Sequence, residues 1–198
     1  MDLDTIVVVS GLPRSGTSMM MKMLEAGGME VLTDEIRSAD EDNPKGYYEF
    51  ERVKQIESDQ GWLPDAQGKA VKMVGALLEH LPSGYVYKII FMERNIEEVL
   101  ASQREMLVRR GEPTDRISDE KMGALFHKHV VQIKSRIAER PEMEVLNVRY
   151  SDVLEEPASQ ADRINRFLGN TLDADRMARV VDPNLYRQRS FHSSPMNG

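Results

Sequence analysis

The chain has 198 residues, of which 40% are hydrophobic and 30% are charged, a composition that suits one folded domain with a sizeable core. Its formal net charge of −7 argues against a broad basic face, so we expect no nucleic-acid partner. The absence of cysteine excludes disulfides, thiolate catalysis and cysteine-held metals.

The N-terminal sequence carries no recognisable targeting signal. Its first four residues, MDLD, lack a basic region, and the apolar run at residues 6–9 is too short for a signal peptide or a membrane span. These observations favour a cytoplasmic protein without a membrane span. We expect residues 1–198 to form a single domain, with a mobile tail from about residue 190.

Predicted strands and helices alternate along the chain. Residues 5–10 (TIVVVS) are continuously apolar and β-branched, as in a strand buried on both faces, and a helix follows to about residue 26. Further strands are predicted at residues 70–74, 85–92 and 144–148, and further helices at residues 48–60 and 76–81, after Asn95, and at residues 119–138 and 159–168. This alternation predicts an α/β fold with a mostly parallel sheet.

The helix predicted at residues 119–138 has an apolar stripe that we expect to face the core. Its members are Met122, Leu125, Phe126, His129, Val130, Ile133 and Ile137. We therefore interpret His129 as a core residue. The other histidines, His80, His127 and His192, match no nucleophile or metal spacing, so we expect no catalytic metal.

Residues 11–18 (GLPRSGTS) form a glycine-rich loop between the first predicted strand and helix. Their spacing matches the phosphate-binding pattern GxxxxGK[ST], in which backbone N–H groups and a helix N-terminus face the anion. Ser18 supplies the terminal hydroxyl, but Thr17 replaces the lysine that would reach the β- and γ-phosphates of a nucleoside triphosphate. Arg14 is the one cation in this sequence segment, so the loop predicts an anionic ligand other than ATP.

The motif PRSGT at residues 13–17 resembles the donor-binding loop of the sulfotransferase family, in the arginine form of tyrosylprotein sulfotransferases. The resemblance implies a three-layer P-loop fold, with a central sheet flanked by helices, and the donor 3′-phosphoadenosine 5′-phosphosulfate. It further implies that Arg14 neutralises the sulfuryl and bridging oxygens. The residues implied to hold the 5′-phosphosulfate are Ser15, Gly16, Thr17 and Ser18.

Arg94 follows the strand predicted at residues 85–92, and Ser102 lies eight residues later on the inward side of the next helix. In the sulfotransferase family, which this chain resembles, an arginine and a serine at this spacing bind the donor's 3′-phosphate. The carboxyl end of a core strand is also where ligands of open α/β sheets bind. Taken alone, Arg94 is equally well interpreted as a surface ion pair with Glu97 or Glu98, and Ser102 as a small packing residue.

Three further positions resemble the family less closely. Tyr150 lies in the segment RYSDV, which is similar to the family's YEDL motif, whose tyrosine contacts the nucleotide; packing at a strand end explains this residue equally well. Arg187 and Arg189 lie where family members close the 3′-phosphate site with basic residues, although the RKG pattern of cytosolic members is absent.

The identity of the general base stays open. Cytosolic members carry a catalytic histidine in a strand segment KTH, and the corresponding stretch here keeps Lys72 as a second sulfuryl-contacting cation but has Val74 at the histidine position. Carboxylate-using members carry a glutamate 21 residues after the loop arginine, which is Glu35 here, and Glu49 is a second candidate in the same acceptor-facing region. Each glutamate is also explained as a solvated charge, since the chain has 33 acidic residues.

Together these patterns predict an enzyme that moves a sulfuryl group to a hydroxyl or amine of a small-molecule or peptide acceptor and releases adenosine 3′,5′-bisphosphate. Two alternatives stay open: a kinase or NTPase with a degenerate loop, and a non-catalytic nucleotide-binding protein on the same scaffold. Thr17 counts against the first, and the retained cations Arg14 and Lys72 count against the second. The sequence identifies neither the acceptor nor the oligomeric state.

Overall fold

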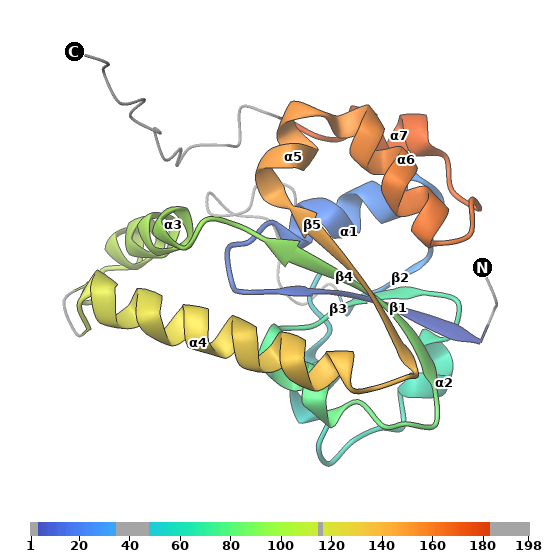
Figure 1. The fold of residues 1–198 in the computed structure, drawn as a ribbon, viewed down its shortest axis with the longest axis horizontal. Helices are drawn as coiled ribbons and strands as arrows, with labels where there is room; N and C mark the ends of the chain where they lie inside the picture. The colour runs from blue at the N-terminus through green and yellow to red at the C-terminus, as the bar shows by residue number, and fades with distance from the viewer. Residues whose placement is uncertain (1–3, 35–47, 115–116, 183–198) are drawn as a thin grey trace.

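A five-stranded parallel sheet forms the centre of the protein, seen here in a computed structural model that describes residues 4–34, 48–114 and 117–182 (Figure 1). The strands, in the spatial order β2-β3-β1-β4-β5, are β1 (Thr5–Gly11), β2 (Val31–Leu32), β3 (Ala70–Lys72), β4 (Val86–Glu93) and β5 (Met143–Arg149). Every pairing in this sheet is parallel. The predicted α/β fold with a parallel sheet is therefore confirmed.

Helices cover both faces of the sheet (Figure 1). They are the α-helices α1 (Thr17–Ala26), α2 (Leu63–Ala66), α3 (Ile96–Arg109), α4 (Asp119–Ala138), α5 (Tyr150–Glu155), α6 (Pro157–Phe167) and α7 (Ala174–Arg179), and the 3₁₀ helices η1 (Glu51–Gln55) and η2 (Gly75–His80). No helix in the described part of the chain combines the length and the apolar character that crossing a membrane requires.

The central strand β1 explains the two helical layers. Its side chains alternate between the two faces, and every residue from Ile6 to Val9 is fully buried. Val7 and Val9 pack in a core with α1, α5, α6 and α7, whereas Ile6 and Val8 pack in a second core with η1, α2, η2 and α4. Burial on both faces accounts for the unbroken apolar run in the sequence.

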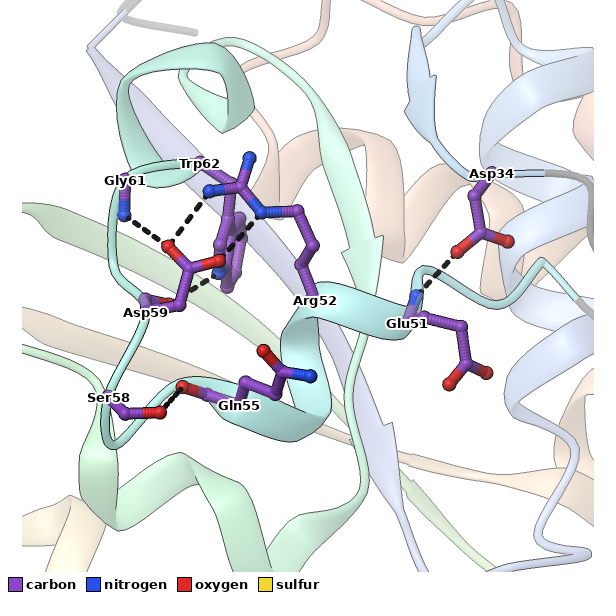
Figure 2. A network of polar contacts seen from close by, with 8 residues as sticks. All are labelled: Asp34, Glu51, Arg52, Gln55, Ser58, Asp59, Gly61 and Trp62. Carbon is purple, nitrogen blue, oxygen red and sulfur yellow. Dashed lines mark hydrogen bonds and ion pairs between the residues drawn. The ribbon is translucent and has the colours of Figure 1, made fainter.

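The helix predicted at residues 48–60 is wrong for most of its length, since only the five residues of η1 are helical and they form a 3₁₀ turn. Figure 2 shows the contacts that bend the chain here: Arg52 binds Asp59 through two hydrogen bonds of 2.8 Å, and Asp59 also accepts from the Gly61 N–H. The Trp62 indole donates to the Asp59 carbonyl at 3.1 Å. These contacts replace the helical ladder because Asp side chains compete for backbone groups.

The predicted core stripe on α4 is confirmed only near its C-terminus. The bounds of α4 match the prediction, but Ile133 and Ile137 are the buried residues of this helix. Leu125 is 54% exposed and His129 is half-buried, so the interpretation of His129 as a core residue is wrong. The N-terminal part of α4 extends beside α3, away from the sheet, where less of its surface is covered (Figure 1).

Candidate functional site

The glycine-rich loop joins β1 to α1 at the carboxyl edge of the sheet. Two of its glycines are required by close contacts: a Cβ on Gly11 would lie 2.6 Å from the Met92 carbonyl oxygen, and one on Gly16 would lie 2.4 Å from Cδ2 of Tyr150. Gly16 also adopts φ 97°, which L side chains rarely allow. The loop therefore lies tightly against β4 and α5.

The loop presents the chemistry of an anion site. Gly16 is the N-cap of α1, and the first turn of α1 contains no acidic residue. The N–H groups of a first helical turn lack carbonyl partners within the helix and carry partial positive charge, so they suit a phosphate or sulfate. The Ser15 hydroxyl is buried and donates to the Leu12 carbonyl at 2.7 Å, so this side chain stabilises the turn from inside.

Arg14 connects the loop to α3. It adopts φ 69°, a left-handed conformation that is uncommon for a residue with a side chain. Its Nε donates to Oγ of Ser102 at 3.0 Å, across 88 positions of sequence. Ser102 is 7% exposed, which confirms that it lies on the inward side of α3.

Arg94 follows β4 and is held from three directions. Its Nη1 donates to the carbonyl of Arg14 at 3.0 Å, its Nε donates to Glu98 at 3.0 Å, and its guanidinium lies 4.4 Å from the ring centre of Tyr150. The side chains of Arg94 and Glu98 are only 8% and 5% exposed. The alternative interpretation, a surface ion pair with Glu97 or Glu98, is thus half correct: Arg94 does pair with Glu98, but the pair is buried.

Tyr150 lies beneath the loop at the start of α5. It is 6% exposed, and its ring fills the space that a side chain at Gly16 would need. Burial raises the pKa of its hydroxyl, while the nearby positive charge of Arg94 acts in the opposite direction. The hydroxyl is therefore protonated at neutral pH, and the ring is placed to support both the loop and Arg94.

Lys72 reaches the loop from the other side of β1. It is the last residue of β3, which pairs with β1, and its Nζ donates to Oγ of Ser18 at 3.5 Å. Val74, two residues further on, is 48% exposed. Lys72 thus approaches, from β3, the loop that carries the other predicted cation, Arg14.

Glu49 belongs to a segment that is fastened to the end of β2, the strand beside β3. The Glu49 carbonyl accepts from the N–H of Asp34 at 3.1 Å and from Oγ1 of Thr33 at 2.9 Å. The Glu51 N–H donates to Asp34 at 2.6 Å (Figure 2). Glu49 therefore lies at the same edge of the sheet as the end of β3, where Lys72 is.

The remaining predicted site residues lie outside the described residues, as does the predicted tail. They are Glu35, Arg187 and Arg189.

The motifs did not single out two features of this region. One is the burial of Glu98, which the sequence presents only as a charge four residues after Arg94 on a helix. The other is a cavity of about 200 Å³ beside the loop, lined by Leu12, Phe91, Arg94 and Val130 among others. Neither has a sequence signal of its own, because each depends on how α3 and α4 pack against β4.

Comparison with known proteins gives one family and two similar solved structures. The family model described as the sulfotransferase domain matches residues 4–194. One similar structure is a retinol dehydratase in complex with androsterone and inactive cofactor PAP, which is 17% identical to this chain with a TM-score of 0.45. The match covers 91% of this chain and 64% of the retinol dehydratase chain. A second is the sulfotransferase domain from the curacin biosynthetic pathway, which is 17% identical to this chain with a TM-score of 0.46. That match covers 91% of this chain and 84% of the curacin-pathway domain. No curated protein matches the sequence.

Proposed function

The chain belongs to the sulfotransferase domain family, and on this premise we propose that it transfers a sulfuryl group from 3′-phosphoadenosine 5′-phosphosulfate to a small-molecule or peptide acceptor. The observation that carries the proposal is the meeting of Arg14 with both Ser102 and Arg94. Two guanidinium groups beside a glycine-rich loop suit a ligand with two separate anionic groups, such as a 5′-phosphosulfate and a 3′-phosphate.

The proposed donor fits the residues that are present. The N-terminus of α1 offers backbone N–H groups without a competing carboxylate in its first turn. Arg94 and Ser102 would bind the 3′-phosphate, and the loop residues Thr17 and Ser18 would hold the 5′ side. Tyr150, which packs between the loop and Arg94, would contact the nucleotide between the two anionic groups.

In the proposed reaction, a bond forms between the acceptor oxygen or nitrogen and sulfur, and the bond from sulfur to the bridging phosphate oxygen breaks. Adenosine 3′,5′-bisphosphate leaves with the electron pair of that bond. Arg14 and Lys72 would supply positive charge to the sulfuryl oxygens and the leaving oxygen, where negative charge develops. A carboxylate would take the acceptor's proton, and Glu49 or Glu35 is proposed for this role.

Thermal unfolding with three nucleotides tests the proposal. Adenosine 3′,5′-bisphosphate should raise the melting temperature more than AMP or ADP with magnesium does, because a ligand that binds only the folded state stabilises it by mass action. Stabilisation by ADP with magnesium alone would instead indicate a kinase or NTPase. Bisphosphate binding without transfer from labelled donor to any acceptor in a panel of alcohols, amines and peptides would indicate a non-catalytic protein.

A further inference from the structure

Glu98 is a carboxylate in an unusual place. It lies near the start of α3, 5% exposed, whereas the neighbouring Glu97 is exposed to solvent. Removing a carboxylate from water is unfavourable unless a partner compensates for the lost hydration. Glu98 has such a partner in Arg94, whose Nε donates to its Oε2 at 3.0 Å.

The contact sets the orientation of the Arg94 guanidinium. With Nε on Glu98, the Nη1 group is directed to the Arg14 carbonyl at 3.0 Å, and the guanidinium carbon lies 4.4 Å from the centre of the Tyr150 ring. A guanidinium is rigid and planar, so fixing one N–H direction fixes the others. Glu98 thus determines where the remaining N–H groups of Arg94 point.

The same contact reaches the glycine-rich loop. The Arg14 carbonyl that Arg94 binds belongs to a residue in the left-handed conformation, φ 69°. Tyr150, with which Arg94 makes a cation–π contact, packs against Gly16 of that loop. A displaced Arg94 would therefore release two supports of the loop at once.

We propose that Glu98 is a positioning residue, which holds Arg94 in the orientation that binds the nucleotide's 3′-phosphate and keeps Arg14 in its left-handed turn. The inference rests on the proposed function, because it takes the 3′-phosphate as the ligand of Arg94. In this role Glu98 acts through Arg94 and is not itself a ligand of the nucleotide.

The direction in which phosphate affinity changes when the charge of Glu98 is removed distinguishes this positioning role from a simple electrostatic effect. Glu98→Gln removes a negative charge near a phosphate site, which by itself tightens phosphate binding. Loosening Arg94 has the opposite effect. Glu97→Gln is the matched control, because it removes the same charge one residue away, from an exposed side chain.

The experiment measures Kd for adenosine 3′,5′-bisphosphate and for AMP by calorimetry, in the wild type and in Glu98→Gln, Glu98→Asp and Glu97→Gln. In both Glu98 variants we expect the preference for the bisphosphate over AMP, measured as the ratio of their Kd values, to fall roughly tenfold, which is the scale of one weakened charge-assisted contact. Glu97→Gln should keep the wild-type preference. Glu98→Asp keeps the charge but withdraws the carboxylate by one methylene, so it serves if Glu98→Gln does not fold.

The proposal requires this loss in each Glu98 variant that folds, and an unchanged or increased preference overturns it. A wild type that binds the bisphosphate no more tightly than AMP would instead contradict the proposed function itself. The two failures are therefore distinguished by the wild-type measurement alone.

Discussion

Arg14 Nε donates to Ser102 Oγ at 3.0 Å, although the two residues lie in the loop after β1 and in the middle of α3. The contact ties the glycine-rich loop to the helix that follows β4. A serine hydroxyl that accepts from a cation gains a charge-assisted hydrogen bond, which is stronger than a neutral one. The region proposed to bind the 5′ side of the donor and the region proposed to bind its 3′-phosphate are thus parts of one site.

Ser102→Ala should weaken binding of adenosine 3′,5′-bisphosphate by roughly tenfold, because it removes the hydroxyl that orients Arg14 and that is proposed to contact the 3′-phosphate. Calorimetry of the purified variant checks this. Ser135→Ala, on the exposed side of α4, is the matched control and should bind like the wild type. Equal affinity in Ser102→Ala and Ser135→Ala would remove Ser102 from the site.

Arg94→Ala should weaken the bisphosphate more than AMP, by at least roughly tenfold in the ratio of their Kd values, because AMP lacks the phosphate that Arg94 is proposed to bind. Arg104→Ala is the control on the helix that follows Arg94, α3, since Arg104 is exposed and pairs with Asp119. An equal loss for both nucleotides would mean that Arg94 supports the loop without recognising the 3′-phosphate.

Glu49→Gln and Glu35→Gln address the general base, and the residue that serves as base should lose transfer by roughly 100-fold to 10,000-fold when substituted. Donor binding should be unchanged, because the amide keeps the size of the side chain. The measurement pairs turnover of labelled donor with bisphosphate affinity. Glu51→Gln, at an exposed side chain of the same segment, is expected to retain activity. Full turnover in both candidate variants would place the base elsewhere.

Gly16→Ala should impair folding stability and nucleotide binding together. Its Cβ would lie 2.4 Å from the Tyr150 ring, and φ 97° is unfavourable for alanine, a strain of about 1–3 kcal/mol. At this chain length, each kcal/mol corresponds to a fall in Tm of roughly 2–4 °C. Gly84→Ala is the control, because nothing lies within 4 Å of the added Cβ. A Gly16 variant with wild-type Tm and affinity would show that the loop adapts.

Elements with strong local signals were predicted well. The apolar run of β1, the glycine loop and the start of α3 after Asn95, whose side chain accepts from the Glu97 N–H at 2.8 Å, are encoded in short stretches of sequence. The two-residue strand β2 and the helices α2, α5 and α7 were not predicted. Strand β2 exists because Val31 and Leu32 pair with β3, and no local pattern encodes that pairing.

The sequence by itself determined the parallel α/β fold and the loop with Thr17 in place of lysine, because each depends on neighbouring residues and their spacing. Only the tertiary structure decided that Arg94 is held between Glu98, Tyr150 and the Arg14 carbonyl. These partners come from α3, α5 and the loop, which the parallel sheet brings to one edge. A hydrogen bond across 80 residues leaves no spacing pattern, so its presence follows from the packing alone.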